Sequence, residues 1–211
     1  FSALWLGLCA SHVPDSGVIL PPREERWRIG FFGVLSIALS NMSLLLNSVS
    51  FYQISKLLII PIAVGLNVLD GHEQKHSAAT VSSLLLMSVG VIFTSVVDLQ
   101  LNGKGTLFAF ASVLATARYQ TRLGSALRQY DISPTELTRQ LAFPQTAWSV
   151  LPLLAFDAPK FAAAQVDNGV VSASVPQLKF LILSCSCAIL VNIASAGVIG
   201  KLSVVTFQVV G

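Results

Sequence analysis

The stretch from Ile29 to Leu69, IGFFGVLSIALSNMSLLLNSVSFYQISKLLIIPIAVGLNVL, decides the fold because it carries a single charge, Lys56, in 41 positions. One membrane crossing takes about 20 apolar residues in a helix, so this stretch predicts two spans joined by a tight turn near residues 47–50. An ammonium group at membrane depth is costly and usually meets a negative ligand or partner. Alternatively, the long stem of Lys56 could carry the charge to the nearby membrane surface. The sequence leaves both readings open.

The composition of the whole chain is that of an integral membrane protein. Hydrophobic residues make up 54% and charged residues 11% of the 211 positions, whereas about 25% of residues are charged in soluble domains. Further apolar runs, cut short, lie near both ends of the sequence. We therefore expect an all-α, polytopic helix bundle with six full and two partial helices, in an internal fragment of a longer protein. The full helices are predicted at about residues 30–48, 51–69, 78–98, 105–126, 135–156 and 178–200.

The basic residues of the connections alternate between the two sides of the predicted bundle. Nine of them lie in the connections at residues 12–28, 70–76, 118–139 and 201, and the intervening connections hold only Lys104, Lys160 and Lys179. Basic residues are in excess on the cytosolic side of membrane proteins, so the first set is predicted to be cytosolic. The net charge of +3 thus reflects topology, and no basic stripe indicates nucleic-acid binding.

Polar side chains gather around the predicted turn of the hairpin. Tyr52 and Lys56 are one helical turn apart and share a face, so a phenol and an ammonium group would point the same way. This pair suits a phosphate or a sugar hydroxyl. Asn41 and Asn47 lie on the first arm, where hydrogen bonding between helices is the competing explanation.

Two further polar points lie in later helices. Gln120 follows Arg118 near a helix end, and Arg118 is expected to reach the cytosolic interface. Asn192 lies deeper in the last full helix, where an amide needs hydrogen-bonding partners. Contact with a ligand and contact between helices both remain open for Asn192.

His72, Glu73 and His76 spell H-E-x-x-H, the signature in which two histidines hold zinc and the glutamate activates water. The segment is a short polar connection between two spans, and His12 is the only other histidine. We therefore expect a solvated loop, and a membrane metalloprotease is the remote alternative. The cysteines form no metal-binding pattern, so neither a metal nor a cofactor is predicted.

The run from Asn41 to Lys56, NMSLLLNSVSFYQISK, followed by Pro61, resembles the central signature of the triose-phosphate and nucleotide-sugar transporter family within the drug/metabolite transporter superfamily. The segments DLQLN at 98–102 and GKLSVVTFQVVG at 200–211 are similar to later segments of that family, in the same order. The resemblance spans essentially the whole chain.

The resemblance implies a ten-helix carrier built from two inverted five-helix repeats, with its site near the midplane between them. Residues 1–211 would then form a single carrier domain truncated at both ends, from the end of helix 2 to the start of helix 9. Lys56 stands where the family has a fourth-helix lysine that meets substrate phosphate. Relatives place a second substrate-facing lysine just beyond the position of Gly211.

The expected function is therefore that of a membrane antiporter and not of an enzyme. It would exchange a nucleotide sugar, which the resemblance indicates to be a UDP-sugar, for a nucleoside monophosphate. Phe51, Tyr52 and Gln53 resemble the Golgi branch, with the plastid or endoplasmic reticulum membrane as alternatives. Exchange of a sugar phosphate or triose phosphate for phosphate is the alternative activity, and a scaffold without transport is another. The partners expected are a small anionic substrate and the lipid bilayer, with a homodimer left open. The residues expected to bind substrate are Lys56, Tyr52, Asn47, Gln120 and Asn192.

Three departures from the family pattern leave the sugar undetermined. Asn67 stands where many relatives have an acidic residue, and Ile92 replaces a frequent glycine. Arg118 and Tyr119 alter a stretch that is usually less charged.

Overall fold

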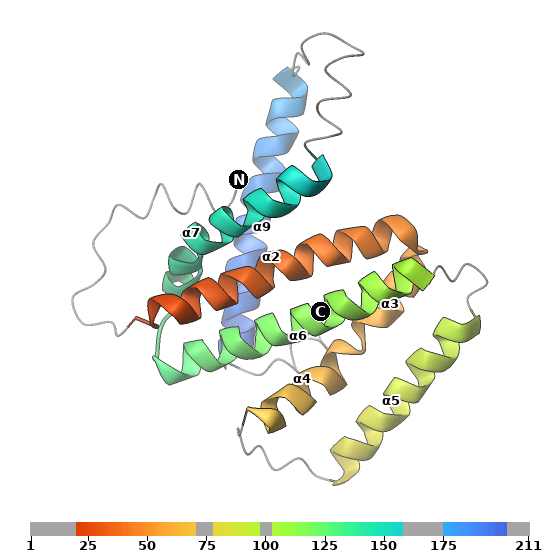
Figure 1. Cartoon of the computed structure of the whole chain (residues 1–211). Coiled ribbons are helices and arrows are strands. Elements are labelled where there is room, and N and C mark those ends of the chain that lie inside the picture. The colour runs from red at the N-terminus through yellow and green to blue at the C-terminus, as the bar shows by residue number, and fades with distance from the viewer. Residues whose placement is uncertain (1–19, 71–77, 98–102, 158–174, 202–211) are drawn as a thin grey trace.

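The computed structural model describes residues 20–70, 78–97, 103–157 and 175–201, and helices make up most of this part of the chain (Figure 1). The predictions for the two partial helices and for His72, Glu73 and His76 fall outside the described residues. The helices are α2 (Arg23–Leu46), α3 (Val49–Lys56), α4 (Ile59–Leu69), α5 (Ala78–Val97), α6 (Gly103–Gln129), α7 (Pro134–Pro152), the π-helical turn η2 (Leu153–Asp157) and α9 (Val175–Lys201).

All six predicted helical regions are present, and the hairpin turn is confirmed at residues 47–48, between α2 and α3. The helix predicted from residue 30 instead begins at Arg23. Glu24 and Glu25 lie in its first turn, where negative side chains are favoured by the helix dipole. The charged segment ahead of the apolar run is therefore part of the same helix.

The helix predicted over residues 51–69 is divided in two, because it is interrupted directly after Lys56. Pro61 has no backbone N–H, so it cannot donate to the carbonyl of Leu57 four residues earlier, and its ring crowds that carbonyl. The N–H of Ile60 donates to the Leu57 carbonyl instead, at 3.3 Å. The chain thus tightens to three-residue spacing between α3 and α4.

Figure 1 shows α2 and α6 side by side in the middle of the fold, with α7 on one flank and α3, α4 and α5 on the other. Glycines allow the central contacts to be close. A Cβ atom on Gly30 would lie 2.9 Å from Cβ of Pro144 in α7, and one on Gly33 would lie 3.1 Å from the Tyr119 ring in α6. Small residues allow such close approach of helices in membranes.

The buried core lies where α6 meets α2, α4, α7 and α9. Two of its five members on α6, Ala117 and Ala126, are alanines, and such small residues let neighbouring helices approach closely. The core includes Ile29, Ile59, Ala63, Val113, Ala117, Leu123, Ala126, Leu127, Leu137, Leu141, Ala196 and Ile199.

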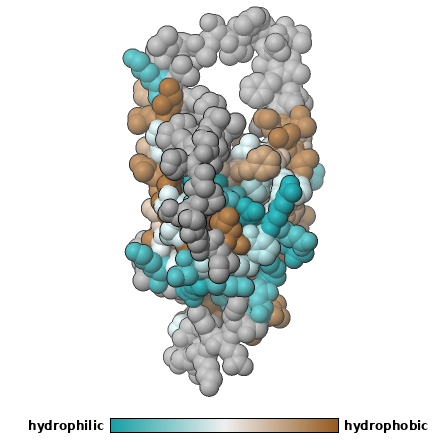
Figure 2. All heavy atoms as spheres, turned by 90° about the vertical axis from the view of Figure 1, so that its left-hand side faces the viewer, coloured by the Kyte–Doolittle hydropathy of each residue, from teal (hydrophilic) through white to brown (hydrophobic). Residues whose placement is uncertain are grey.

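The protein is an all-α, polytopic membrane protein. Within the described ranges, the segments Arg23–Leu46, Val49–Leu69 and Ile182–Lys201 are long and apolar enough to cross a membrane. Figure 2 looks at the molecule from the side where α2 begins and α6 ends, and hydrophilic residues gather in a band across the middle and lower middle of this view. Outward-facing apolar side chains such as Leu86, Phe93 and Phe180 are what a bilayer would cover.

Candidate functional site

A cavity of about 260 Å³ lies between α2, α3 and α6 and combines a cation with hydroxyl and amide groups. Apart from Ile37, Ile59 and Val113, every side chain that lines it is polar. Polar groups that gather in an otherwise apolar helix bundle mark a ligand path by default. The lining residues are Ser36, Ile37, Ser40 and Asn41 from α2, Tyr52 and Lys56 from α3, Ser112, Val113 and Thr116 from α6, and Ile59 from α4.

Lys56 and Tyr52 form one wall of the cavity. The ammonium nitrogen of Lys56 lies 4.3 Å from the centre of the Tyr52 ring, a distance at which the negative ring face attracts a cation. Both side chains are half-buried. Among the described residues no carboxylate forms an ion pair with Lys56, so its charge is available to an anion.

Local interactions fix α3, which carries both residues. The hydroxyl oxygen of Ser48 caps the helix by accepting a hydrogen bond from the backbone N–H of Phe51 at 3.1 Å. Phe51 and Ser55, each one position before a member of the cavity pair, are buried. The helix is only eight residues long, so this anchoring determines where Tyr52 and Lys56 point.

Asn47 does not line the cavity. Its Nδ2 donates a hydrogen bond to Oγ of Ser43 at 3.1 Å, and its side chain packs directly against Gly105 at the start of α6. Asn47 thus makes a contact between helices, which was the alternative to ligand binding in the interpretation of the sequence.

Gln120 and Asn192 also lie outside the cavity lining. Gln120 is buried on α6, one turn beyond Thr116 and therefore on the same face. Asn192 is exposed on α9, a helix that contacts α6 and α7.

The sequence interpretation missed four hydroxyl groups of the cavity, on Ser36, Ser40, Ser112 and Thr116. They form two pairs, each spaced by four residues within an apolar helix, and such spacing places both members of a pair on one face. That repeated spacing was a signal that could have identified them.

A second cavity of about 250 Å³ lies between α2 and α7 and is lined by residues such as Phe31, Leu35, Trp148 and Leu151. Its lining carries no charged side chain. A charged ligand would lose its hydration there without compensation, so the cavity at Lys56 is the better candidate for an anion.

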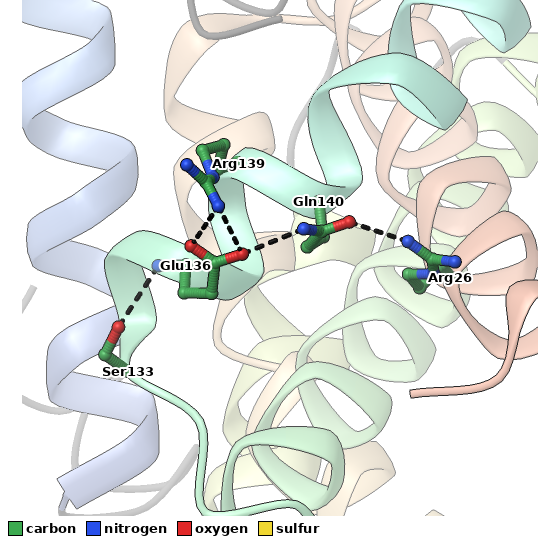
Figure 3. A network of polar contacts seen from close by, with 5 residues as sticks. All are labelled: Arg26, Ser133, Glu136, Arg139 and Gln140. Atoms are coloured by element: carbon green, nitrogen blue, oxygen red, sulfur yellow. Dashed lines mark hydrogen bonds and ion pairs between the residues drawn. The ribbon is translucent and has the colours of Figure 1, made fainter. Parts of the chain in front are cut away.

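A polar network joins α2 to α7 at the end of the bundle where α2 begins, which we call the charged end (Figure 3). Nη1 of Arg26 donates to Oε1 of Gln140 at 2.6 Å, and Nε2 of Gln140 donates to Oε1 of Glu136 at 2.8 Å. Glu136 also forms an ion pair with Arg139 at 2.8 Å, and its backbone N–H donates to Oγ of Ser133 at 3.2 Å. Ser133 thus caps the start of α7, and Glu136 is linked through Gln140 to Arg26 on α2.

Two more contacts lie toward this end. The hydroxyl of Tyr130 donates to Oε2 of Glu25 at 3.0 Å, and burial and this carboxylate raise the pKa of Tyr130. Arg118 pairs with Asp70 at 2.6 Å, which connects the end of α4 to α6. These contacts bring together the segments that the charge alternation assigns to one side. Within the described part of the chain, no group of three His, Cys, Asp or Glu residues could hold a metal ion.

Comparison with known proteins gives the site its context. The chain is 34% identical to UDP-rhamnose/UDP-galactose transporter 2 of Arabidopsis thaliana over 188 residues, which are 88% of this chain and 53% of that protein. It is 36% identical to UDP-xylose transporter 3 of the same plant over 196 residues, 90% of this chain and 53% of the relative. The chain thus spans about half the length of these relatives. No family model matches it.

Proposed function

Because this chain belongs to the nucleotide-sugar transporter family, we propose that it is part of a membrane antiporter that exchanges a UDP-sugar for a nucleoside monophosphate. Its relatives are transporters and not enzymes, so no catalytic residue is assigned. The observation that carries the proposal is the cavity between α2, α3 and α6, where Lys56 has no carboxylate partner among the described residues.

The chemistry of the cavity supports an anionic substrate that also carries hydroxyl groups. The ammonium group of Lys56 can donate up to three hydrogen bonds to phosphate oxygens. The hydroxyl and amide groups of the lining can bond to a sugar, a ribose or a base. An apolar ligand would leave the Lys56 ammonium group without a hydrogen-bond acceptor, which is costly.

The same lysine supports exchange in preference to one-way release. Closing the empty cavity would bury an unpaired charge, and that desolvation is costly. A bound phosphate offsets the cost, so only the loaded carrier should change easily between its outward-open and inward-open states. The entry of one anion would thereby be coupled to the exit of another.

The test is counterflow in liposomes that contain the protein at its full natural length, with a panel of nucleotide sugars and sugar phosphates. Liposomes preloaded with nucleoside monophosphate should take up labelled UDP-sugar much faster than empty liposomes. Equal rates would rule out antiport. Uptake of sugar phosphates or triose phosphates against phosphate, with no uptake of nucleotide sugars, would favour the alternative exchanger.

We also propose the Golgi membrane as the location, on the resemblance of residues 51–53 to the Golgi branch of the family. A fluorescent fusion of the protein should overlap with a Golgi marker in cells. Overlap with a plastid or endoplasmic reticulum marker instead would contradict this assignment.

A further inference from the structure

Three hydroxyl groups in the cavity have their protons already committed to their own helices. Oγ of Ser36 lies 2.8 Å from the carbonyl oxygen of Gly33, and Oγ of Ser112 lies 2.8 Å from that of Ala109. Oγ1 of Thr116 lies 2.7 Å from the carbonyl oxygen of Ser112. A carbonyl oxygen can only accept, so in each bond the hydroxyl must be the donor.

These three side chains can therefore only accept hydrogen bonds from a ligand. A hydroxyl has one proton and two lone pairs, and turning the proton toward the cavity would break the bond to the backbone. Ser36 belongs to α2, and Ser112 and Thr116 belong to α6. We call these three residues the acceptor wall. Ser40 and Asn41 also line the cavity and are not part of it.

The Lys56 side chain has the reverse hydrogen-bonding character. The ammonium group of Lys56, on α3, donates hydrogen bonds and accepts none. The cavity thus presents the ammonium donor from α3 and the three acceptors from α2 and α6. A phosphate group, whose oxygens accept, fits Lys56 and would face only lone pairs at the acceptor wall, where its lost hydration is not replaced.

We propose that the acceptor wall orients the substrate: phosphate lies toward Lys56, and a hydroxyl-bearing ring donates hydrogen bonds to Ser36, Ser112 and Thr116. This inference rests on the proposed function and adds the direction in which the substrate lies. Sugar hydroxyls and ribose hydroxyls share the required chemistry, and the experiment below separates them.

Fluorine provides the test, because a C–F group is close to a hydroxyl in size but cannot donate. Exchange of UDP-sugars with one sugar hydroxyl replaced by fluorine is compared with exchange of the parent and of the 2′-deoxy-2′-fluoro nucleotide. Loss of one neutral hydrogen bond should lower the exchange efficiency about 3- to 10-fold for at least one analogue. The analogue that is affected identifies the ring, sugar or ribose, that faces the wall.

Variants of the wall link the loss to these residues. The variants Ser36→Ala, Ser112→Ala and Thr116→Val should each exchange the parent substrate less efficiently than the unmodified protein. In at least one of them, the fluorinated analogue should be exchanged as efficiently as the parent substrate. Thr116→Ser keeps an acceptor and should keep the fluorine penalty. Thr146→Val is the matched control, because Thr146 makes the same bond to its own helix, at 2.8 Å to the Ala142 carbonyl, but does not line the cavity.

Two results would overturn the proposal. Full exchange of every fluorinated analogue by the unmodified protein is one, and a fluorine penalty that persists unchanged in all three wall variants is the other. Either result leaves nucleotide-sugar exchange intact. If the unmodified protein exchanges no nucleotide sugar at all, it is the proposed function that fails. Thermal melting of each variant in detergent separates loss of folding from loss of binding.

Discussion

The ammonium nitrogen of Lys56 lies 4.3 Å from the centre of the Tyr52 ring, and the two residues occupy successive turns of one short helix. The ring stabilises the cation without neutralising it. A carboxylate in the place of the ring would hold the lysine in a salt bridge that a substrate phosphate must break. The arrangement thus keeps the positive charge in position and available.

Replacement of Lys56 by Ala should abolish most exchange, because a hydrogen bond to a charged group contributes about 1.5–3 kcal/mol, or roughly 10- to 150-fold in exchange efficiency. Lys56→Arg should retain little of the exchange efficiency of the unmodified protein, since a planar guanidinium group presents its donors differently from an ammonium group. Lys201→Ala, at an exposed lysine at the end of α9, is the control. Liposome exchange assays measure all three, and normal exchange by Lys56→Ala would contradict the assignment.

The Tyr52 ring can be tested separately from its hydroxyl. Tyr52→Phe keeps the ring face and should retain most of the binding, whereas Tyr52→Leu should weaken it because a cation–π contact contributes about 0.5–2 kcal/mol. The measurement is the dissociation constant for nucleoside monophosphate. An equal loss of affinity in the two variants would mean that the hydroxyl group of Tyr52, and not its ring, contributes to binding.

Gly105 should resist enlargement because of Asn47. A Cβ atom at position 105 would lie 2.7 Å from Cγ of Asn47, so Gly105→Ala should destabilise the protein by about 1–3 kcal/mol through overpacking. Asn47→Ala should relieve this effect in the double variant. Gly65→Ala on α4 is the control, since nothing lies within 4 Å of a Cβ there. Thermal melting in detergent measures the series, and strictly additive effects would show that the two positions do not interact.

The pair of Arg118 and Asp70 should stabilise the contact between α4 and α6. Their side chains are 23% and 31% exposed, so Asp70→Ala should cost only about 1 kcal/mol. The charge-swapped double variant, Asp70→Arg with Arg118→Asp, should recover part of the lost stability. Glu24→Ala removes a looser contact, 4.0 Å from an exposed Arg28, and should change the melting temperature little. A larger effect at Glu24 than at Asp70 would refute this ranking.

The sequence predicted the helices well because a run of apolar residues bounded by polar connections has few structural solutions in a membrane. It also predicted that Tyr52 and Lys56 share a face, because both lie on one helix with a fixed period. Helix positions and spacing within a helix are local properties of the chain. The structure agrees with the sequence on both of these points.

The sequence was less informative about which polar groups face each other. A helix that is apolar on all sides has no stripe to show its orientation, so Asn47, Gln120 and Asn192 could not be ranked against Ser36 or Ser112. Their position depends on close contacts between distant segments, such as Asn47 against Gly105. The break between α3 and α4 depends on Pro61, whose presence alone does not distinguish a gentle kink from an interruption.

The interruption caused by Pro61 lies directly behind Lys56, and this determines what can move independently. The carbonyl of Leu57 has lost its usual helical donor, so the joint between α3 and α4 resists bending less than an unbroken helix would. Meanwhile α4 stays packed through Ile59 and Ala63 in the core. Rotation about the few backbone dihedrals of residues 57 and 58 can therefore tilt α3 as a unit, which moves the Tyr52 ring and the Lys56 ammonium group together with buried Phe51 and Ser55, while Ile59 and Ala63 stay packed.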